Sequence, residues 1–424
     1  MRTWPEAFLR RMEAQLGSDF AAFCAALQEQ PKKALHINSI KTDRAELSEL
    51  LNLPLPVLSE NPDGASVPNA FNPNATPLHA AGLFYMQEAT AQAPVASAAL
   101  PEEPVVLDLC AAPGGKSAQL AAKMRGGVLF SNEIVPSRAE VLAGNLERMG
   151  VVNAIVTNSE PKPLCERLKA RCDLVLVDAP CAGEAMFRKD EQAVRDWSPE
   201  HVETCAVRQR AILEDAAKAV KPGGALVYST CSFSPQENEE TVRYFLDRHT
   251  EFSIVETQRL YPHTSAGEGQ FFAVLSRQGM RVPSVFSIGK SDKVPAFETF
   301  QEQLRLPAGQ IRLLKDGRVL LLPAMPFPFD GVKLVRAGLL LGELRGSRFE
   351  PAHALAMAGK ETPFYRTCAL SFDEAMRYLR GETLQRDAEK GYGAATFAGH
   401  ALGLYKASDG MLKNHYPKGL RLLK

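Results

Sequence analysis

A regular alternation of strand-like and helical runs fills the middle of this 424-residue chain. Such alternation with short turns predicts a parallel sheet covered by helices on both faces. We therefore expect an α/β fold with a doubly wound, Rossmann-like sheet. The expected strands are residues 105–109, 127–132, 154–157, 173–178 and 224–229, and the expected helices are residues 115–124, 136–149, 200–220 and 235–248. Residues 253–256 and 271–276 are candidates for two final strands, one of them antiparallel.

The chain is too long for a single hydrophobic core, so we expect more than one domain. Residues 54–77 are rich in Pro, Asn and Gly and indicate a loop or a domain boundary, and residues 276–297 resemble a linker. We predict an N-terminal region over residues 1–98, the α/β domain over 99–280 and a small β-rich module over 286–424. Further expected elements are a strand at 34–40, a helix at 78–99 and short strands at 311–314 and 319–322.

The formal net charge is zero, but the charge is unevenly distributed. Residues 281–424 carry 22 Lys and Arg against 14 Asp and Glu, a local charge of +8, whereas residues 1–98 carry seven against ten. A basic module on an otherwise neutral chain favours contact with phosphate backbones, and a solvated basic surface is the alternative.

Targeting and metal-binding signals are missing from the sequence. No apolar stretch reaches the length of a membrane span, and the amphipathic start does not resemble a signal peptide. The eight cysteines include no CxxC pair and no Cys/His ligand cluster, so we expect no metal site. Scattered thiols are typical of a reducing cytoplasm, and we expect a cytoplasmic monomer without membrane contact.

A glycine turn follows the first expected strand of the sheet. Backbone amides at such a turn, with a helix behind them, stabilise a negative group on a ligand. A P-loop would need Gly at position 110, which is Cys, and no G-x-G-x-x-G fingerprint is present. The remaining cofactor of this shape is S-adenosylmethionine, whose methionine carboxylate the amides would receive. The loop residues are Cys110, Ala111, Ala112, Pro113, Gly114, Gly115 and Lys116.

The cofactor interpretation also predicts polar residues at the ends of later strands. Glu133 ends the second strand, where a carboxylate would bind the ribose hydroxyls; capping of the helix at 136 is the alternative role. Asn158, after the third strand, is a candidate for the adenine edge, with Glu160 as the alternative. Asp108 is expected to orient the loop rather than to contact the ligand.

Two cysteines follow the last two parallel strands, fifty residues apart. Cys181 lies in DAPCAGEAMFRK and Cys231 in STCSFSPQENE, at strand ends where open α/β sheets bind ligands. Carbon 5 of a pyrimidine accepts a methyl group only after a nucleophile adds to carbon 6, which a thiolate does well. The residues themselves leave open which cysteine attacks. The isolated Cys110, Cys165, Cys172 and Cys205 are expected to be small buried hydrophobes.

Three motifs carry a family resemblance. DLCAAPGGKS, DAPCAGEAMFRK and STCSFSPQENE, in this order and spacing, resemble the RNA 5-methylcytosine methyltransferases of the Sun family, and among them the RsmF-type enzymes that act on 16S ribosomal RNA. PLHAAGLFYMQEATAQ and GEGQFFAVLSR resemble the segments flanking the family's motifs. GLLLGELRGSRFEPAHALAMA and LKNHYPKGLR resemble the RNA-binding module of the RsmF group, so the likeness covers nearly the whole chain.

The resemblance implies a class I methyltransferase sheet, a PUA-like C-terminal module and a division of labour. Cys231 would be the nucleophile, and Cys181 would help to release the methylated product. Asp178 would hold or protonate the ring edge of the cytosine beside the cofactor, and Pro180 would shape the pocket. The implied activity is methyl transfer from S-adenosylmethionine to carbon 5 of a cytosine in 16S rRNA. Transfer RNA as substrate, or a catalytically silent assembly factor, are the alternatives.

RNA contacts are expected at basic residues in two places. Arg188 and Lys189 would contact phosphate near the target base, with a solvated surface as the alternative. Near the C-terminus the expected backbone contacts are Lys413, Lys418 and Arg421.

Three positions depart from the family pattern. Ala182 and Ala185 stand where the family usually has Ser and Gly, and His36 stands where an Arg is common. The first two are expected to tune the pocket, and an RNA contact made by that Arg has no counterpart at this position.

Overall fold

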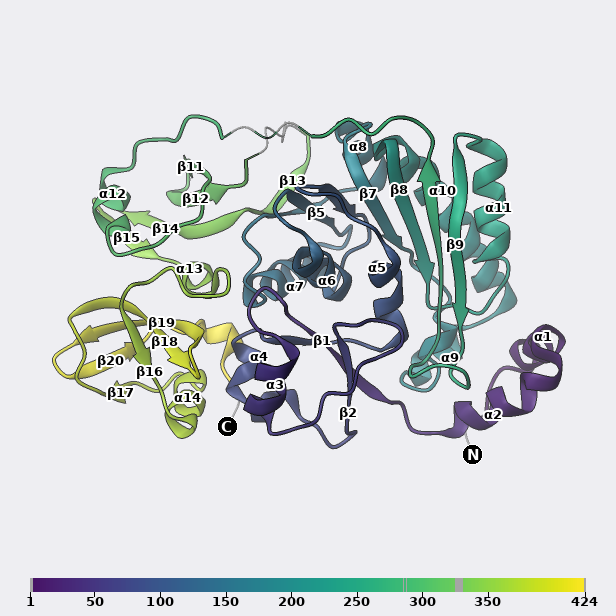
Figure 1. Cartoon of the computed structure of the whole chain (residues 1–424), viewed down its shortest axis with the longest axis horizontal. Coiled ribbons are helices and arrows are strands. Elements are labelled where there is room, and N and C mark those ends of the chain that lie inside the picture. Colours follow the sequence, from purple (N-terminus) through teal and green to yellow (C-terminus); the bar gives the residue numbers. More distant parts are fainter. Residues whose placement is uncertain (1–2, 285, 287, 325–330, 423–424) are drawn as a thin grey trace.

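An eight-stranded sheet forms the centre of the protein (Figure 1). The structure is a computed structural model and describes residues 3–284, 286, 288–324 and 331–422. The strand order is β13-β6-β5-β4-β7-β8-β10-β9, with β4 to β8 parallel and β9, β10 and β13 each antiparallel to a neighbour. The doubly wound sheet predicted from the alternating pattern is therefore confirmed. The bounds are β4 (Val105–Asp108), β5 (Val128–Asn132), β6 (Ala154–Asn158), β7 (Cys172–Asp178), β8 (Val220–Thr230), β9 (Phe252–Leu260), β10 (Gln270–Arg277) and β13 (Lys333–Ala337).

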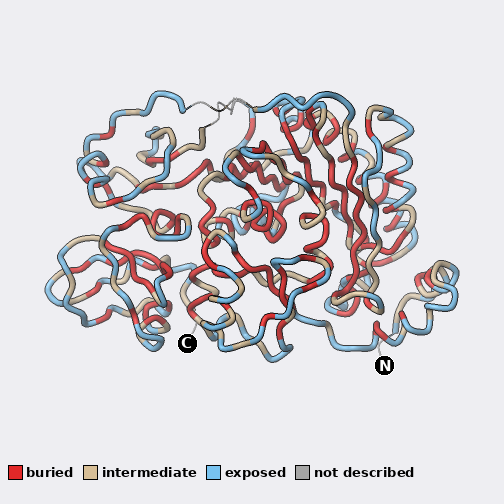
Figure 2. Tube along the Cα trace, viewed as in Figure 1, coloured by how far each residue is buried: buried red, intermediate tan, exposed pale blue. Residues whose placement is uncertain are grey.

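Helices cover both faces of this sheet because successive strand residues point to opposite sides. On β4, Val105 and Leu107 belong to the core under α8, α10 and α11, whereas Val106 belongs to the core under α5, α6 and α7. Figure 2 shows buried residues running along the central strands. The helices are α5 (Ala93–Ser97), α6 (Gly115–Lys123), α7 (Pro136–Arg148), α8 (Pro161–Arg167), α10 (Pro199–Ala219) and α11 (Glu239–Arg248).

The register of the parallel strands places their carboxyl ends at one edge. Asp108 pairs with Ser131 of β5 and with Leu176 of β7, and Asp178 pairs with Ser229 of β8. The loops that follow β4, β5, β7 and β8 therefore meet at this edge, which is where open parallel sheets bind ligands.

The N-terminal region contains a small antiparallel sheet and two helices that pack beside the carboxyl-end loops. The sheet has the order β2-β1-β3. Phe8 of α1 and Phe23 of α2 share a buried cluster with Phe187 and Phe233, which lie in the loops after β7 and β8. The bounds are α1 (Glu6–Leu16), α2 (Phe20–Gln28), β1 (Lys33–Ile37), α3 (Arg44–Leu51), β2 (Gly64–Val67) and β3 (Phe84–Met86).

The expected helix over residues 78–99 is wrong. This segment forms α4 (Pro77–Ala80), β3, a short turn of 3₁₀ helix and α5. Gly82 has a φ of +75°, and a Cβ there would lie 1.9 Å from the Arg148 carbonyl oxygen, so the chain leaves the helical path at this glycine. β3 then pairs with β1, which a continuous helix would prevent.

The C-terminal segment, expected as one β-rich module, contains two further sheets. The first has the order β11-β12-β14-β15 and the second has the order β16-β18-β19-β20-β17. Between β12 and β14 the chain contributes β13 to the edge of the central sheet, where it pairs with β6. The remaining bounds are α9 (Glu191–Asp196), α12 (Pro295–Gln301), β11 (Gln310–Leu313), β12 (Arg318–Leu322), β14 (Leu339–Arg345), β15 (Arg348–Pro351), α13 (His353–Met357), β16 (Thr367–Ala369), α14 (Phe372–Leu379), β17 (Leu384–Gln385), β18 (Gly391–Phe397), β19 (His400–Ser408) and β20 (Met411–Asn414).

Candidate active site

The turn between β4 and α6 is held tightly against its neighbours. Gly114 has a φ of +113°, which favours glycine, and a Cβ on Gly115 would lie 3.1 Å from the Tyr85 ring. The Ala111 amide donates to the Asn132 carbonyl oxygen at 2.8 Å, and the Asn145 amide donates to the Pro113 carbonyl oxygen at 2.9 Å. The loop is thereby shaped before any ligand binds.

Asp108 lies beneath this loop, as expected for a residue that orients it. Ser117 Oγ donates to Asp108 Oδ2 at 2.7 Å, while the buried Oδ1 has no hydrogen-bond partner among the described residues. Burial raises the pKa of Asp108 to about 7, opposed by the Ser117 hydrogen bond.

A cavity of about 520 Å³ runs from this loop to the two cysteines. Glu133 lines it with a side chain that is only 4% exposed, accepting from the Val135 amide at 2.9 Å and pairing with Arg138 at 3.2 Å. The residues that line the cavity are Leu109, Cys110, Ala112, Asn132, Glu133, Ile134, Arg138, Glu160, Pro161, Asp178, Ala179, Pro180, Cys181, Arg208, Ile212 and Cys231. A buried carboxylate at the end of β5 and a glycine turn at the end of β4 fit a nucleoside cofactor with an amino-acid tail.

Asn158 is placed less favourably than expected. Its side-chain amide donates to the Glu133 and Ile134 carbonyl oxygens, both at 2.8 Å, and it does not line the cavity. Glu160, the alternative from the sequence, does line it. Asn158 therefore supports the backbone around Glu133, and Glu160 is the better candidate for the adenine edge.

The two motif cysteines lie side by side in the cavity wall. Cys181 Sγ and Cys231 Sγ are 3.0 Å apart, close enough for one thiol to donate to the other sulfur. The hydrogen bond with Cys231, together with burial, raises the pKa of Cys181 well above its usual value. Cys181 is thus a thiol at neutral pH and is able to donate to the Cys231 sulfur.

An ion pair lies next to the sulfurs. Lys116 Nζ is 2.8 Å from Asp178 Oδ2, and Ser229 Oγ donates to Asp178 Oδ1 at 2.7 Å. Burial alone would lower the pKa of Lys116, but the Asp178 charge and hydrogen bond outweigh it, and the pKa is raised. Lys116 therefore stays cationic near Cys231, and a cation stabilises a thiolate.

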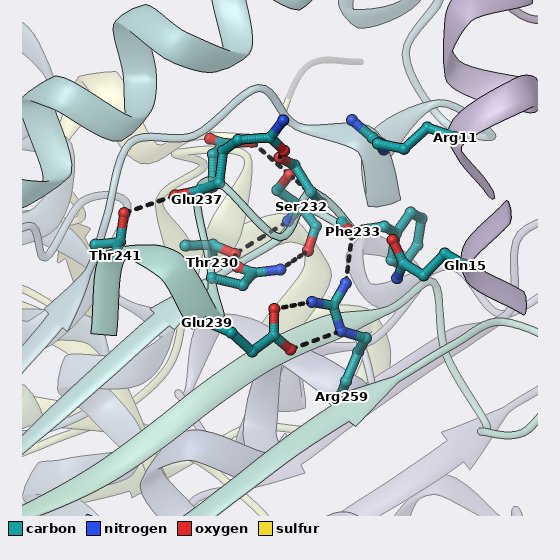
Figure 3. A network of polar contacts seen from close by, with 12 residues as sticks. Arg11, Gln15, Thr230, Ser232, Phe233, Glu237, Glu239, Thr241 and Arg259 are labelled. Carbon is teal, nitrogen blue, oxygen red and sulfur yellow. Dashed lines mark hydrogen bonds and ion pairs between the residues drawn. The ribbon is translucent and has the colours of Figure 1, made fainter. Parts of the chain in front are cut away.

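A network of polar side chains holds the loop after β8, which carries Cys231 (Figure 3). Thr230 Oγ1 donates to Asn238 Oδ1 at 2.6 Å, and Asn238 Nδ2 donates to the Ser232 carbonyl oxygen at 2.8 Å. Arg259 of β9 donates to the Phe233 carbonyl oxygen and pairs with Glu239. The loop after β8 is thus tied to α11 and to β9.

Glu184 joins the loop after β7 to the N-terminal helices. Its buried carboxylate accepts from Arg11 of α1 at 2.7 Å, from the Trp197 indole at 2.7 Å and from the Phe233 amide at 2.8 Å. The N-terminal region is therefore part of the scaffold of the cysteine site.

The expectation that Arg188 contacts phosphate does not hold in this structure. Its side chain is 1% exposed, pairs with the equally buried Glu268 at 2.5 Å, and donates to the Ala26 carbonyl oxygen at 2.8 Å. The guanidinium is used inside the protein, where a phosphate could reach it only by displacing these partners. The neighbouring Lys189 also lies 3.7 Å from Glu268, but its side chain is partly exposed and lines a groove together with Lys32 and Lys33.

The three C-terminal basic residues are placed unequally. Lys413 on β20 and Lys418 are exposed. Arg421 is half-buried, and a Cβ on Gly381 would lie 2.4 Å from its Nε, so this side chain packs against the chain after α14. Lys413 and Lys418 are the better placed of the three to contact RNA.

The sequence analysis did not single out Arg208 and Asn132, which both line the cavity beside the two cysteines. Asn132 is the last residue of β5, next to the predicted Glu133. Arg208 lies on α10 with an exposed side chain, and helical periodicity could have shown only that it faces away from the core.

Four family models match consecutive parts of the chain. The model of 16S rRNA methyltransferase RsmB/F matches residues 96–276, and the N-terminal domain of 16S rRNA methyltransferase RsmF matches residues 4–89. The RsmF rRNA methyltransferase first C-terminal domain matches residues 299–358, and the methyltransferase RsmF PUA domain matches residues 365–422.

Whole-length relatives carry the same name. The protein named ribosomal RNA small subunit methyltransferase F from Klebsiella pneumoniae (strain 342) is 31% identical and covers 98% of this chain and 96% of its own. The protein of that name from Cronobacter sakazakii (strain ATCC BAA-894) gives the same three values. The chain belongs to the RsmF family of 16S rRNA methyltransferases. The family resemblance drawn from the three motifs is thereby confirmed.

Solved structures agree with this family assignment. A methyltransferase homologue from Pyrococcus horikoshii is 26% identical with a TM-score of 0.59, and covers 65% of this chain and 95% of its own. NSun6 from the same organism, solved with SFG, has a TM-score of 0.56 at 20% identity, covers 65% and 99%, and shows the fold. As an RsmF-family member, the protein is an S-adenosylmethionine-dependent methyltransferase with a C-terminal PUA domain.

The departures from the RsmF family pattern are explained by packing. Ala182 and Ala185 are each 5% exposed and place their methyl groups in the apolar cluster shared with α1 and α2. His36 is buried, and burial lowers its pKa to about 4, so it is neutral at pH 7 and presents no charge to RNA.

In the part of the chain that the structure describes, no helix is long and apolar enough to cross a membrane, and no group of three His, Cys, Asp or Glu could hold a metal.

Proposed function

We propose that the protein transfers a methyl group from S-adenosylmethionine to carbon 5 of a cytosine in 16S rRNA, through a covalent adduct between Cys231 and carbon 6. The observation that carries this proposal is the 3.0 Å contact between Cys181 and Cys231 in the wall of the cofactor-sized cavity. S-adenosylmethionine supplies the electrophilic methyl group when it is bound. Cys110–Gly115 and Glu133 would hold its two ends.

The site residues divide the remaining chemistry. The Cys231 thiolate adds to carbon 6, and the electron pair displaced onto the ring makes carbon 5 nucleophilic toward the methyl group. Carbon 5 would then take the methyl group, whose bond to the cofactor sulfur breaks with its electron pair left on that sulfur. The proton on carbon 5 leaves to water and its electrons restore the double bond to carbon 6, so the bond between carbon 6 and Cys231 breaks with its electrons returning to the sulfur. The Cys181 thiol donates a hydrogen bond to the departing sulfur. Asp178, fixed by Lys116 and Ser229, would accept from the exocyclic amine of the cytosine.

The target cytosine must leave any base stack to reach these residues, because carbon 6 is inaccessible within the stack.

Lys413 supports RNA binding by the PUA domain. It is paired with the exposed Lys406 of β19, and like charges at paired positions repel unless an anion lies between them. Lys189 and Lys418 would add phosphate contacts. We also propose that the protein acts as a monomer in the cytoplasm.

Adduct trapping tests the roles of the cysteines. With 16S rRNA and cofactor, Cys181→Ala should accumulate a covalent protein–RNA complex on denaturing gels, because the departing sulfur loses its donor. Cys231→Ala should form none, and Cys368→Ala in the PUA domain serves as the matched control. The reverse pattern would overturn the assignment.

The substrate is tested with radiolabelled cofactor and bisulfite sequencing. Purified protein should form 5-methylcytosine in naked 16S rRNA or in small subunits. Methylation confined to tRNA would reassign the substrate, and the absence of 5-methylcytosine from every RNA would indicate a silent assembly factor.

A further inference from the structure

One buried carboxylate contacts both cysteine loops. Glu237 Oε1 accepts from the amide of Ala182, the residue after Cys181, at 2.9 Å. Glu237 Oε2 accepts from the hydroxyl of Ser232, the residue after Cys231. Figure 3 shows Glu237 beside Ser232 at the start of this loop. The two sulfurs are therefore positioned by the two oxygens of a single side chain that is 0% exposed.

Gln209 of α10 adds a further hydrogen bond to the Glu237 carboxylate. Its amide donates to Glu237 Oε1 at 2.8 Å and to the Pro180 carbonyl oxygen at 3.0 Å, and it accepts from the Tyr228 hydroxyl at 3.0 Å. Burial raises the pKa of Glu237. Ala182, Ser232 and Gln209 all donate to its carboxylate, which opposes this rise and favours the ionised form.

The negative charge of Glu237 does not act equally on the two cysteines. Glu237 bonds the backbone directly after Cys181, whereas on the Cys231 side it bonds a side-chain hydroxyl, and Lys116 provides a cation near Cys231. A carboxylate close to a thiol opposes its ionisation, and a cation favours it. The Glu237 charge accordingly contributes to raising the pKa of Cys181, after the Cys231 hydrogen bond, burial and the charge on Cys231. Other titratable or charged groups around this cluster are Glu184, Cys205, Arg208, Arg210 and Tyr228.

We propose that Glu237 is a positioning residue that holds both cysteine loops and places its charge beside the backbone that follows Cys181, so that Cys231 is the attacking sulfur. This inference rests on the proposed function, in which the attacking sulfur is the one that adds to carbon 6 of the cytosine. The protonation states that it assigns can be measured without RNA.

The test is the pH dependence of cysteine alkylation by iodoacetamide, followed for each cysteine by peptide mass spectrometry. In the unmodified protein at pH 7, Cys231 should be alkylated before Cys181. In Glu237→Gln the negative charge is lost while Ala182 and Gln209 keep an oxygen acceptor. Cys181 should then ionise at lower pH and be alkylated about fivefold faster at pH 8, since one pKa unit changes the thiolate fraction about tenfold.

Two controls separate charge from position. Glu240→Gln removes an exposed charge one turn away and should leave both alkylation rates unchanged. Ser232→Ala removes one hydrogen bond but keeps the Glu237 charge, so Cys181 should stay slow.

An unchanged Cys181 profile in a folded Glu237→Gln protein would overturn the inference. Faster alkylation of Cys181 than of Cys231 in the unmodified protein would also overturn the inference. This measurement does not depend on whether the variant folds. Loss of RNA methylation with the expected alkylation pattern would instead count against the proposed function alone.

Discussion

Replacing Arg188 by Met should destabilise the region around the active site strongly. Arg188 and Glu268 are each 1% exposed, and the guanidinium also donates to the Ala26 and Gly267 carbonyl oxygens. Methionine fills much of the space but leaves two carbonyl oxygens without this donor and leaves the buried carboxylate with Lys189, 3.7 Å away, as its cationic partner. Removing one partner of a buried ion pair costs about 3–5 kcal/mol, so we expect a loss of that size in the free energy of unfolding.

The two tryptophans of the sequence make this change measurable. Trp4 stacks on Phe187, the neighbour of Arg188, and Trp197 donates to Glu184, so both rings report on this region. In urea titrations followed by tryptophan fluorescence, a loss of this size lowers the midpoint by about 1.5–2.5 M for a slope of about 2 kcal/mol/M.

Arg195→Met is the matched control, because its ion pair with Glu191 is 67% and 88% exposed. An exposed pair contributes less than about 1 kcal/mol, so its midpoint should barely move. If Arg188→Met were as stable as this control and instead bound RNA weakly, the inward role of Arg188 would be refuted and phosphate contact restored.

Three further predictions concern RNA binding and pH. Arg208→Ala, at the mouth of the catalytic cavity, should raise KM for RNA severalfold without changing cofactor affinity by calorimetry, and an unchanged KM would exclude a substrate contact. Lys413→Glu with Lys418→Glu should weaken RNA binding and reduce the slope of log K against log salt by about 2, measured by filter binding at several salt concentrations. Burial raises the pKa of Asp108 from 3.8 to about 7, so the folded state binds more protons than the unfolded state between these values, and stability contributed by this group falls as pH rises through that window. Asp108→Asn lacks this loss of stability. The melting temperature of the variant minus that of the unmodified protein should therefore increase from pH 4.5 to pH 8, and a constant difference would contradict the assigned pKa.

Much of the fold was predictable because hydrophobic periodicity is a local signal. The central strands and the main helices begin and end within a few residues of the sequence-based bounds, apart from β8 and β9, which are longer, and α11, which begins four residues later. The helix over residues 78–99 failed because Gly82 lies against the backbone of Arg148, a contact between segments far apart in the sequence. The placement of β13 at the edge of the central sheet is of the same kind, since its pairing with β6 joins residues about 180 positions apart.

The sequence by itself determined the chemistry that is available: a glycine turn after the first strand, an acid after the second and a cysteine after each of two later strands. Parallel strands bring these ends together whatever the details of packing. Only the tertiary structure decided how each side chain is used. Arg188 points inward to Glu268, and Glu237 bonds the backbone next to Cys181, because the direction and charge environment of a side chain depend on partners from distant segments. Local patterns place residues on strands and helices, but the neighbours that set their ionisation are contributed by the fold.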